Sequence, residues 1–288
     1  NRSSTPDIGA DEFTPVTTDV GVSKLISPAK SIKADTTDII VAVTNYGIDT
    51  ITSVVVHMKI NNDTLSRKSV IRTFASGDTI IVNLGSYIFK TDSVYSFTSW
   101  TSRPNGVTDG KPSNDTLQLL NRRTAMSGVY TIGGSAPNFT TFKAAINALQ
   151  VAGIADSVRF RVRQGTYTEQ LIIPPIEGAG ARNSIIFESQ DQDTSKVTLQ
   201  FASTKYDTNW VVQFLGADGI TFRYMRVRSY SSNNYNVVFD IRNKAENITL
   251  FRNNIEGSST SYGSTDNALI RSQNEANHYL QILNNQLK

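Results

Sequence analysis

Apolar and polar positions follow two patterns along the chain, and the first covers its front part. Between about Val16 and Leu120, apolar residues alternate with polar ones in short runs, and turn-forming phrases such as Asn45-Tyr46-Gly47 separate the runs. Alternation with a period of two indicates half-buried strands, so this part predicts a β-sandwich. The predicted strands are Val20–Ile26, Asp38–Thr44, Thr52–Ile60, Thr64–Ile71, Thr79–Leu84, Ser93–Trp100 and Asp115–Leu119.

The second pattern is a repeat near the other end of the chain. Three phrases with apolar residues at their second and fourth positions begin at Gly219, Asn247 and Tyr279, at spacings of 28 and 32 residues. A unit of this length cannot bury an apolar face alone, but stacked units share one core. The repeat therefore predicts a right-handed parallel β-helix. Each phrase has an apolar run before it (Val211–Phe214, Val237–Ile241, Ala268–Ile270) and an apolar residue after it (Val227, Ile255, Leu287).

Asparagines at corresponding turns support the stacking. Asn253 and Asn254 follow one phrase, and Asn284 and Asn285 follow the next. Stacked side-chain amides can hydrogen-bond along a pile of coils, so we expect a ladder at this turn.

A short helix is predicted where the β-helix begins. After a strand at Val129–Ile132, the segment 138–149 places Phe142, Ile146 and Leu149 on one helical face, and Thr140 or Thr141 is the expected N-cap. Such a helix would cover the open end of the stack, as solenoid caps must. Further strands are predicted at Ser157–Val162, Glu169–Ile173, Ser184–Glu188 and Val197–Phe201.

These patterns predict an all-β chain in three parts. Residues 1–13 form a tail of a preceding domain or a linker, 14–122 the sandwich, and 123–288 the β-helix, which we expect to be truncated at its C-terminal end. The chain begins at Asn1 without a Met or a signal-like segment, so neighbouring domains of a longer precursor are the expected partners.

Composition narrows the function classes. The net charge of +3 is spread along the chain, without the basic cluster that nucleic-acid binding needs. The chain has no cysteine, which leaves no disulfide or thiolate metal site. No apolar run approaches the roughly 18 residues of a membrane span. We therefore expect neither a nucleic-acid partner nor membrane insertion.

Two phrases of the sandwich resemble the CARDB-type immunoglobulin-like modules of bacterial surface proteins. They are 43–47 (Val-Thr-Asn-Tyr-Gly) and 102–106 (Ser-Arg-Pro-Asn-Gly), with Asn114-Asp115-Thr116 close behind. The tail phrase 7–13 (Asp-Ile-Gly-Ala-Asp-Glu-Phe) resembles the closing segment of β-helix domains in large surface proteins of the Bacteroidetes type. These resemblances imply a secreted or cell-surface spacer or adhesion unit without transferable catalytic residues.

The segment 127–261 resembles the N-terminal coils of pectin methylesterases, which have a pectin-lyase-like β-helix. The resemblance rests on Phe139-Thr140-Thr141-Phe142, on Gly165-Thr166-Tyr167-Thr168-Glu169 and on the stretch from Val237 to Gly257. The catalytic Gln and Asp of that family fall here on Ser259 and Thr260, its Gln-Ala-Val phrase falls near Asn236, and no Asp-Phe-x-Phe-Gly phrase follows.

Without a carboxylate nucleophile the scaffold cannot perform that family's chemistry. We therefore predict a non-catalytic module with no catalytic residues. The alternative is a carbohydrate-active enzyme of the pectin methylesterase or polysaccharide lyase type, whose catalytic residues lie outside this sequence.

Arginines on predicted strands are the candidate binding residues. Arg161 and Arg163 alternate in one strand, and Arg226 and Arg228 in another, which directs their side chains outward. A stripe of guanidinium groups would suit the carboxylates of an acidic polysaccharide or cell-surface glycan, with Tyr224 and Trp210 beside it. The alternative is a set of ordinary solvated arginines and wall-packing aromatic residues.

Metal and nucleophile sites have weaker support. Asp191 and Asp193 are candidate Ca²⁺ ligands, but calcium takes six to eight oxygens, so a solvated turn is favoured. A second group of candidate Ca²⁺ ligands is Asp109, Asn114 and Asp115, and a solvated turn is favoured there for the same reason. We expect no cofactor, and Ca²⁺ is the only candidate ion. His57 and His278 have no triad partner at a suggestive spacing.

Overall fold

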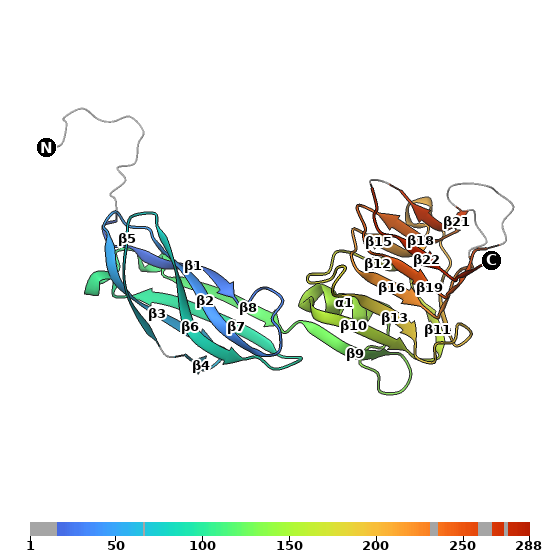
Figure 1. Cartoon of the computed structure of the whole chain (residues 1–288), viewed down its shortest axis with the longest axis horizontal. Helices are drawn as coiled ribbons and strands as arrows, with labels where there is room; N and C mark the ends of the chain where they lie inside the picture. The colour runs from blue at the N-terminus through green and yellow to red at the C-terminus, as the bar shows by residue number, and fades with distance from the viewer. Residues whose placement is uncertain (1–15, 66, 231–235, 259–266, 274–275) are drawn as a thin grey trace, which may run out of the picture. The chain divides into compact units, whose positions relative to one another are not determined.

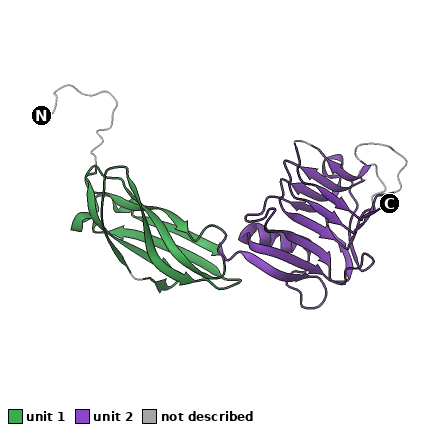
Figure 2. Ribbon diagram, in the orientation of Figure 1, with its two compact units in different colours: residues 1–30, 34–122 green, residues 31–33, 123–288 purple. Residues whose placement is uncertain are grey.

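The computed structural model describes residues 16–65, 67–230, 236–258, 267–273 and 276–288, and it divides into two compact units (Figures 1 and 2). Unit 1 contains the described residues up to Lys30 and Ala34–Arg122, and unit 2 contains Ser31–Lys33 and Arg123–Lys288. Strands dominate both units, and the predicted fold class is confirmed. No helix in the described ranges is long and apolar enough to cross a membrane.

Unit 1 is a sandwich of two sheets. Strands β1, β2 and β6 form one sheet, and β4, β3, β7 and β8 form the other, with β5 also paired to β3. The segment predicted as one strand at Thr64–Ile71 forms two, because Thr64 and Lys68 pair with different parts of β3. The strands are β1 (Val20–Ser27), β2 (Thr36–Asn45), β3 (Ile51–Ile60), β4 (Asp63–Thr64), β5 (Lys68–Phe74), β6 (Thr79–Ile88), β7 (Val94–Ser102) and β8 (Thr116–Arg123).

The core of the sandwich follows from the predicted alternation. In β3, Val54, Val56, Met58 and Ile60 are buried, while the residues between them are more exposed. Alternate side chains of a strand point to opposite faces, so one face of each sheet supplies the core. Two short 3₁₀ turns, Pro104–Gly106 and Pro112–Asn114, lie between β7 and β8.

Unit 2 is a parallel β-helix built from three parallel sheets. The first contains β9, β10, β13, β16, β19 and β22, the second β11, β14, β17, β20 and β23, and the third β12, β15, β18 and β21. The strands of the first sheet are β9 (Met126–Ile132), β10 (Ile154–Val162), β13 (Ile185–Ser189), β16 (Ile220–Arg223), β19 (Thr249–Phe251) and β22 (Gln281–Leu283). Those of the second are β11 (Gly165–Thr168), β14 (Val197–Phe201), β17 (Arg226–Ser229), β20 (Asn254–Glu256) and β23 (Gln286–Leu287). Those of the third are β12 (Leu171–Ile173), β15 (Trp210–Leu215), β18 (Asn236–Arg242) and β21 (Asn267–Ser272).

The three repeated phrases lie in register, which confirms the predicted stacking. Phe222 pairs with Leu250, and Leu250 pairs with Ile282. The apolar residues after the phrases pair in the same way, Val227 with Ile255 and Ile255 with Leu287. Each coil therefore adds one apolar residue to each column of a continuous core.

Left-handed backbone recurs at the corresponding position of the corners where the chain turns between sheets. The first residues of the three phrases, Gly219, Asn247 and Tyr279, have φ of 67°, 52° and 53°. Gly219 is required there for a second reason, since a Cβ atom would lie 2.5 Å from the carbonyl oxygen of Gly180. The polar first position of the repeat is thus explained by turn geometry, which Gly and Asn adopt most readily.

The asparagine ladder forms at the next corner. The backbone N–H of Asn253 donates to Asn285 Oδ1 at 2.8 Å, and Asn285 Nδ2 donates to the carbonyl oxygen of Leu250 at 2.8 Å. Asn253 Oδ1 in turn accepts from the backbone N–H of Met225 at 3.2 Å. Each amide joins two coils, so it satisfies backbone groups at a corner where the sheet ladder is interrupted.

Helix α1 (Phe142–Ala152) lies where the sequence predicts it, and Thr141 is its N-cap, with Oγ1 accepting from the N–H of Ala144 at 3.1 Å. Glu169 completes the cap. Its two carboxylate oxygens accept from the N–H groups of Phe142 and Lys143 at 3.0 and 2.9 Å. An anion at a helix N-terminus satisfies free N–H groups and complements the helix dipole.

Replacing Glu169 with alanine should lower the free energy of unfolding by about 0.5–2 kcal/mol, the range found for lost caps. Glu169→Gln keeps one acceptor oxygen and should cost less. Urea denaturation followed by circular dichroism measures both. Asp191→Ala, at an exposed turn, is the control and should change stability by no more than about 0.5 kcal/mol. A loss for Glu169→Ala no larger than that of the control would contradict the capping role.

Candidate functional site

The wall of the β-helix carries a buried carboxylate. Asp240, on β18, is 0% exposed, and its neighbours in the row across the sheet are Gln213 and Arg271. Gln213 Nε2 donates to it at 2.8 Å, Arg271 Nε donates at 2.9 Å, and Arg242 Nε lies 2.6 Å from Oδ2. A buried carboxylate needs such compensation to remain ionised. Asp240 is thus held in a network with two arginines.

Two other acidic side chains of the wall are paired in the same way. Glu188, on β13, is 2% exposed and lies 2.6 Å from Arg223. Glu256, on β20, lies 2.7 Å from Arg226. These ion pairs link residues of different coils. They therefore connect neighbouring coils of the stack, and each carboxylate is occupied by an arginine.

The structure divides the predicted arginines between two sheets. Arg161 belongs to β10 of the first sheet, and Arg226 and Arg228 belong to β17 of the second. Arg163, just after β10, donates to the carbonyl oxygens of Ser135 and Gly133. The single stripe that alternation suggested is therefore wrong, because the chain turns a corner between these strands.

The aromatic candidates differ in exposure. Trp210 is only 7% exposed. Its predicted place beside the arginines, as a ring open to a glycan, is therefore wrong, because the ring is packed in the wall. Tyr224 is half-buried at a corner, where its ring packs edge-on against Phe251 at a centroid distance of 5.6 Å. Tyr230, by contrast, is 41% exposed, and the Arg228 guanidinium lies 5.8 Å from its ring centroid.

The Ca²⁺ candidates of the β-helix form a capped turn. Asp193 accepts from the backbone N–H of Ser195 at 2.8 Å, and hydrogen bonds from Ser195 lower the pKa of its carboxyl. Asp191 is exposed, and no third acidic or histidine side chain joins the pair within the described ranges. Ser259 and Thr260, at the pectin methylesterase positions, lie outside the described residues.

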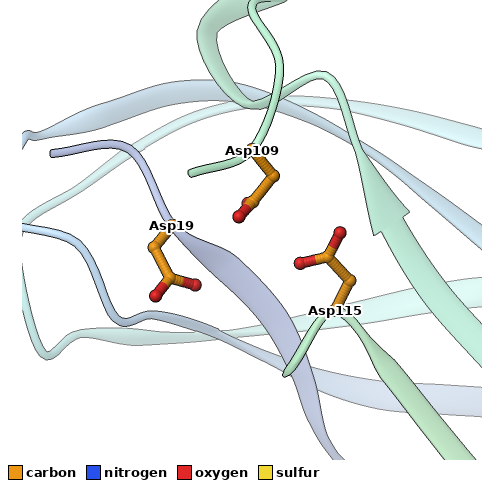
Figure 3. Close-up of side chains that lie close together, drawn as sticks. All are labelled: Asp19, Asp109 and Asp115. Carbon is orange, nitrogen blue, oxygen red and sulfur yellow. The ribbon is translucent and has the colours of Figure 1, made fainter. Parts of the chain in front are cut away.

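Unit 1 contains the acidic cluster of the molecule. Asp19 directly precedes β1, Asp109 lies in the turn after β7, and Asp115 directly precedes β8. Figure 3 shows the three side chains pointing toward one another, and one oxygen of each lies within 4.8 Å of the others. Asp19 is 3% and Asp109 8% exposed. The predicted solvated turn at Asp109, Asn114 and Asp115 is therefore wrong, because Asp109 is buried and Asp19, directly before β1, lies beside Asp109 and Asp115.

The phrase Asn45-Tyr46-Gly47 holds Asp19 in place. The backbone N–H groups of Tyr46 and Gly47 both donate to the carbonyl oxygen of Asp19, at 2.8 and 3.0 Å. Asn45 is fully buried and orders the turn, accepting from the N–H of Gly47 at 3.0 Å. A Cβ atom on Gly47 would lie 2.4 Å from the carbonyl oxygen of Thr17, so only glycine allows this approach.

Hydrogen bonds are distributed unequally over the three carboxylates. Asp109 accepts from the N–H of Val20 at 2.8 Å and from that of Lys111 at 2.7 Å. Asp19 Oδ2 accepts from Asn114 Nδ2 at 3.2 Å, while Asp19 Oδ1 and Asp115 Oδ1 are buried without a hydrogen-bond partner among the described residues.

Burial and mutual repulsion show in the titration of the cluster. Burial, with the charges of Asp109 and Asp19, raises the pKa of Asp115 to about 6. Burial is also the largest cause that raises the pKa of Asp19. Both shifts mean that the cluster disfavours its own negative charge.

Sequence reasoning missed Asp19 because its partners lie 90 and 96 positions away, as the numbering shows. The available signal was the presence of an acidic residue directly before the first strand of the sandwich.

Comparisons with known proteins agree with this architecture. No family model matches the chain, and no curated protein matches it. Among solved structures, the CARDB domain of a Pyrococcus furiosus protein in complex with di-metal ions is 13% identical, covers 40% of this chain and 98% of its own, and has a TM-score of 0.30. A Methanosarcina acetivorans domain named as a cell surface protein is 19% identical over 38% of this chain and 95% of its own, with a TM-score of 0.32.

The pectin methylesterase of Aspergillus niger is similar to a different part. It is 14% identical, covers 57% of this chain and 87% of its own, and has a TM-score of 0.27. The similar structures thus include both families named by the sequence resemblances, and the sandwich and parallel β-helix described above are the architecture that those resemblances implied. At such identities the similarity concerns fold and not activity.

Proposed function

We propose that this chain is a non-catalytic module of a secreted or cell-surface protein, in which a sandwich and a β-helix serve as a spacer and adhesion unit. The observation that supports it most is the state of three carboxylates in the wall of the β-helix. Asp240, Glu188 and Glu256 are all engaged by arginines. A general acid or nucleophile must reach a reacting atom, and these groups face guanidinium partners instead.

The proposed adhesive surface is the part of the second sheet around Arg228 and Tyr230. Arg228 is half-buried and lies close to the exposed Tyr230 ring. A guanidinium group suits a sugar carboxylate, and an adjacent ring suits the apolar face of the sugar. The proposed ligand is accordingly an acidic polysaccharide of the uronic-acid type.

Polygalacturonate should bind the whole chain more tightly than a neutral galactan does. Arg228→Ala should weaken that binding by up to about fivefold, since one exposed ionic contact contributes at most about 1 kcal/mol. Tyr230→Ala should weaken it too, because the aromatic face beside the sugar is lost. Isothermal titration calorimetry measures both affinities. Arg161→Ala is the matched control, because Arg161 is exposed on the first sheet. Equal binding of the neutral polymer, or unchanged binding by both variants, would contradict the adhesive surface. Release of methanol from methyl-esterified pectin would contradict the non-catalytic role.

A further inference from the structure

We propose that Asp19, Asp109 and Asp115 form a binding site for a divalent cation, with calcium as the ion that the donors fit. The site lies in unit 1, at the end of the sandwich where β1 and β8 begin, and does not depend on the glycan-binding surface of unit 2. Three carboxylates from segments that are distant in sequence converge there (Figure 3).

The spacing of the donor atoms agrees with a shared cation. One oxygen from each aspartate lies within 4.8 Å of the other two. Calcium holds oxygen ligands at roughly 2.3–2.6 Å, so two ligands on opposite sides of one ion are up to about 5 Å apart. The cluster can therefore close on one ion by side-chain rotation, without a change of the backbone.

A second observation points independently to a missing ligand. Asp19 is 3% exposed, and its Oδ1 atom has no hydrogen-bond partner in the described part of the chain. Leaving an ionised oxygen buried and unpaired costs several kcal/mol, which proteins normally avoid by pairing. Asp115 Oδ1, in the same cluster, is also buried without a hydrogen-bond partner among the described residues. A cation would satisfy both of these oxygens at once.

The chemistry of the donors selects calcium. They are carboxylate oxygens, and the cluster contains no histidine, while the chain has no cysteine, so a zinc site is disfavoured. Magnesium requires near-ideal octahedral geometry and keeps several waters, whereas calcium accepts irregular sets of six to eight oxygens. Asp109 and Asp115 also line a surface pocket, together with Thr101 and Ser102, through which water ligands and the ion can enter.

The position of the site gives it a structural consequence. Asp19 precedes a strand of the three-stranded sheet, and Asp115 precedes a strand of the other sheet. An ion held between them links the two layers of the sandwich and neutralises the repulsion among the carboxylates. The sandwich is then stabilised in proportion to the logarithm of the calcium concentration above the dissociation constant.

Isothermal titration calorimetry of the whole chain, first treated with EDTA, tests the proposal. CaCl₂ should give a saturable one-site isotherm and should raise the melting temperature of the sandwich by several degrees, with a smaller effect of MgCl₂. Asp19→Asn and Asp115→Asn should each weaken calcium binding at least tenfold. Asp193→Asn, in the capped turn of unit 2, is the matched control and should leave the isotherm unchanged.

The variants remain informative about folding, because an uncharged amide removes repulsion from the empty site. In EDTA, Asp19→Asn should melt no lower than the parent chain, which circular dichroism can verify. The proposal is overturned if the parent chain shows no saturable calcium binding at millimolar concentration. It is also overturned if the Asp19→Asn/Asp115→Asn double variant binds as the parent does, and the choice of ion is overturned if magnesium binds as tightly as calcium.

Discussion

Phe187→Ala should lower the free energy of unfolding of unit 2 by about 3–5 kcal/mol, the range found when a buried aromatic ring is truncated. Phe187 is fully buried and stacks between two other rings. Its centroid lies 4.9 Å from that of Phe160 and 5.0 Å from that of Phe222. All three rings are in one column of the first sheet, so removing the middle ring leaves a void between two coils.

Urea denaturation followed by fluorescence or circular dichroism measures the loss. Phe251→Ala is the matched control: Phe251 lies on β19 of the same sheet, but it is half-buried at the outer wall. Its truncation should cost about 1 kcal/mol, because less apolar area leaves contact with the protein. Equal losses for the two variants would mean that the coils do not share a closely packed interior.

The period of apolar residues made this column predictable. The chain repeats an apolar position at the spacing of one coil, and the pairing of Phe222 with Leu250, and of Leu250 with Ile282, follows from it. The capping helix was equally predictable from the sequence, since Phe142, Ile146 and Leu149 recur at helical spacing, and the structure buries all three. Local patterns of this kind are read correctly because burial and backbone period act within a single strand or helix.

Contacts between coils were not predictable from the same patterns. Whether an outward arginine is free or paired depends on which side chain the next coil brings beside it. Arg226 meets Glu256, which is 30 positions away, whereas Arg228 lies near Tyr230. The acidic cluster shows the same limit, since local counting of carboxylates around Asp109 omits Asp19, which arrives from the start of the sandwich.

Asp240→Asn should lower the free energy of unfolding by about 3–5 kcal/mol, as expected when one partner of a buried ion pair is removed. The side chain of Arg271 is 10% exposed and would keep its charge in the wall without a carboxylate to accept from its Nε atom. Arg242 is more exposed, at 24%, and can turn toward water. The loss should therefore arise mainly from Arg271, and the double variant Asp240→Asn/Arg271→Gln should recover part of it.

Chemical denaturation of the single and double variants gives the coupling energy of the pair. Glu256→Gln is the control, because its partner Arg226 has a side chain that is 39% exposed, and a pair so open to solvent contributes at most about 1 kcal/mol. The comparison also decides between the two readings of the wall. If Asp240→Asn proved neutral, the carboxylate would not be held there for stability, and Asp240 would become a candidate acid–base group on a wall that we regard as non-catalytic. A large loss of stability that the double variant partly recovers would mean that the charge of Asp240 serves to stabilise the β-helix.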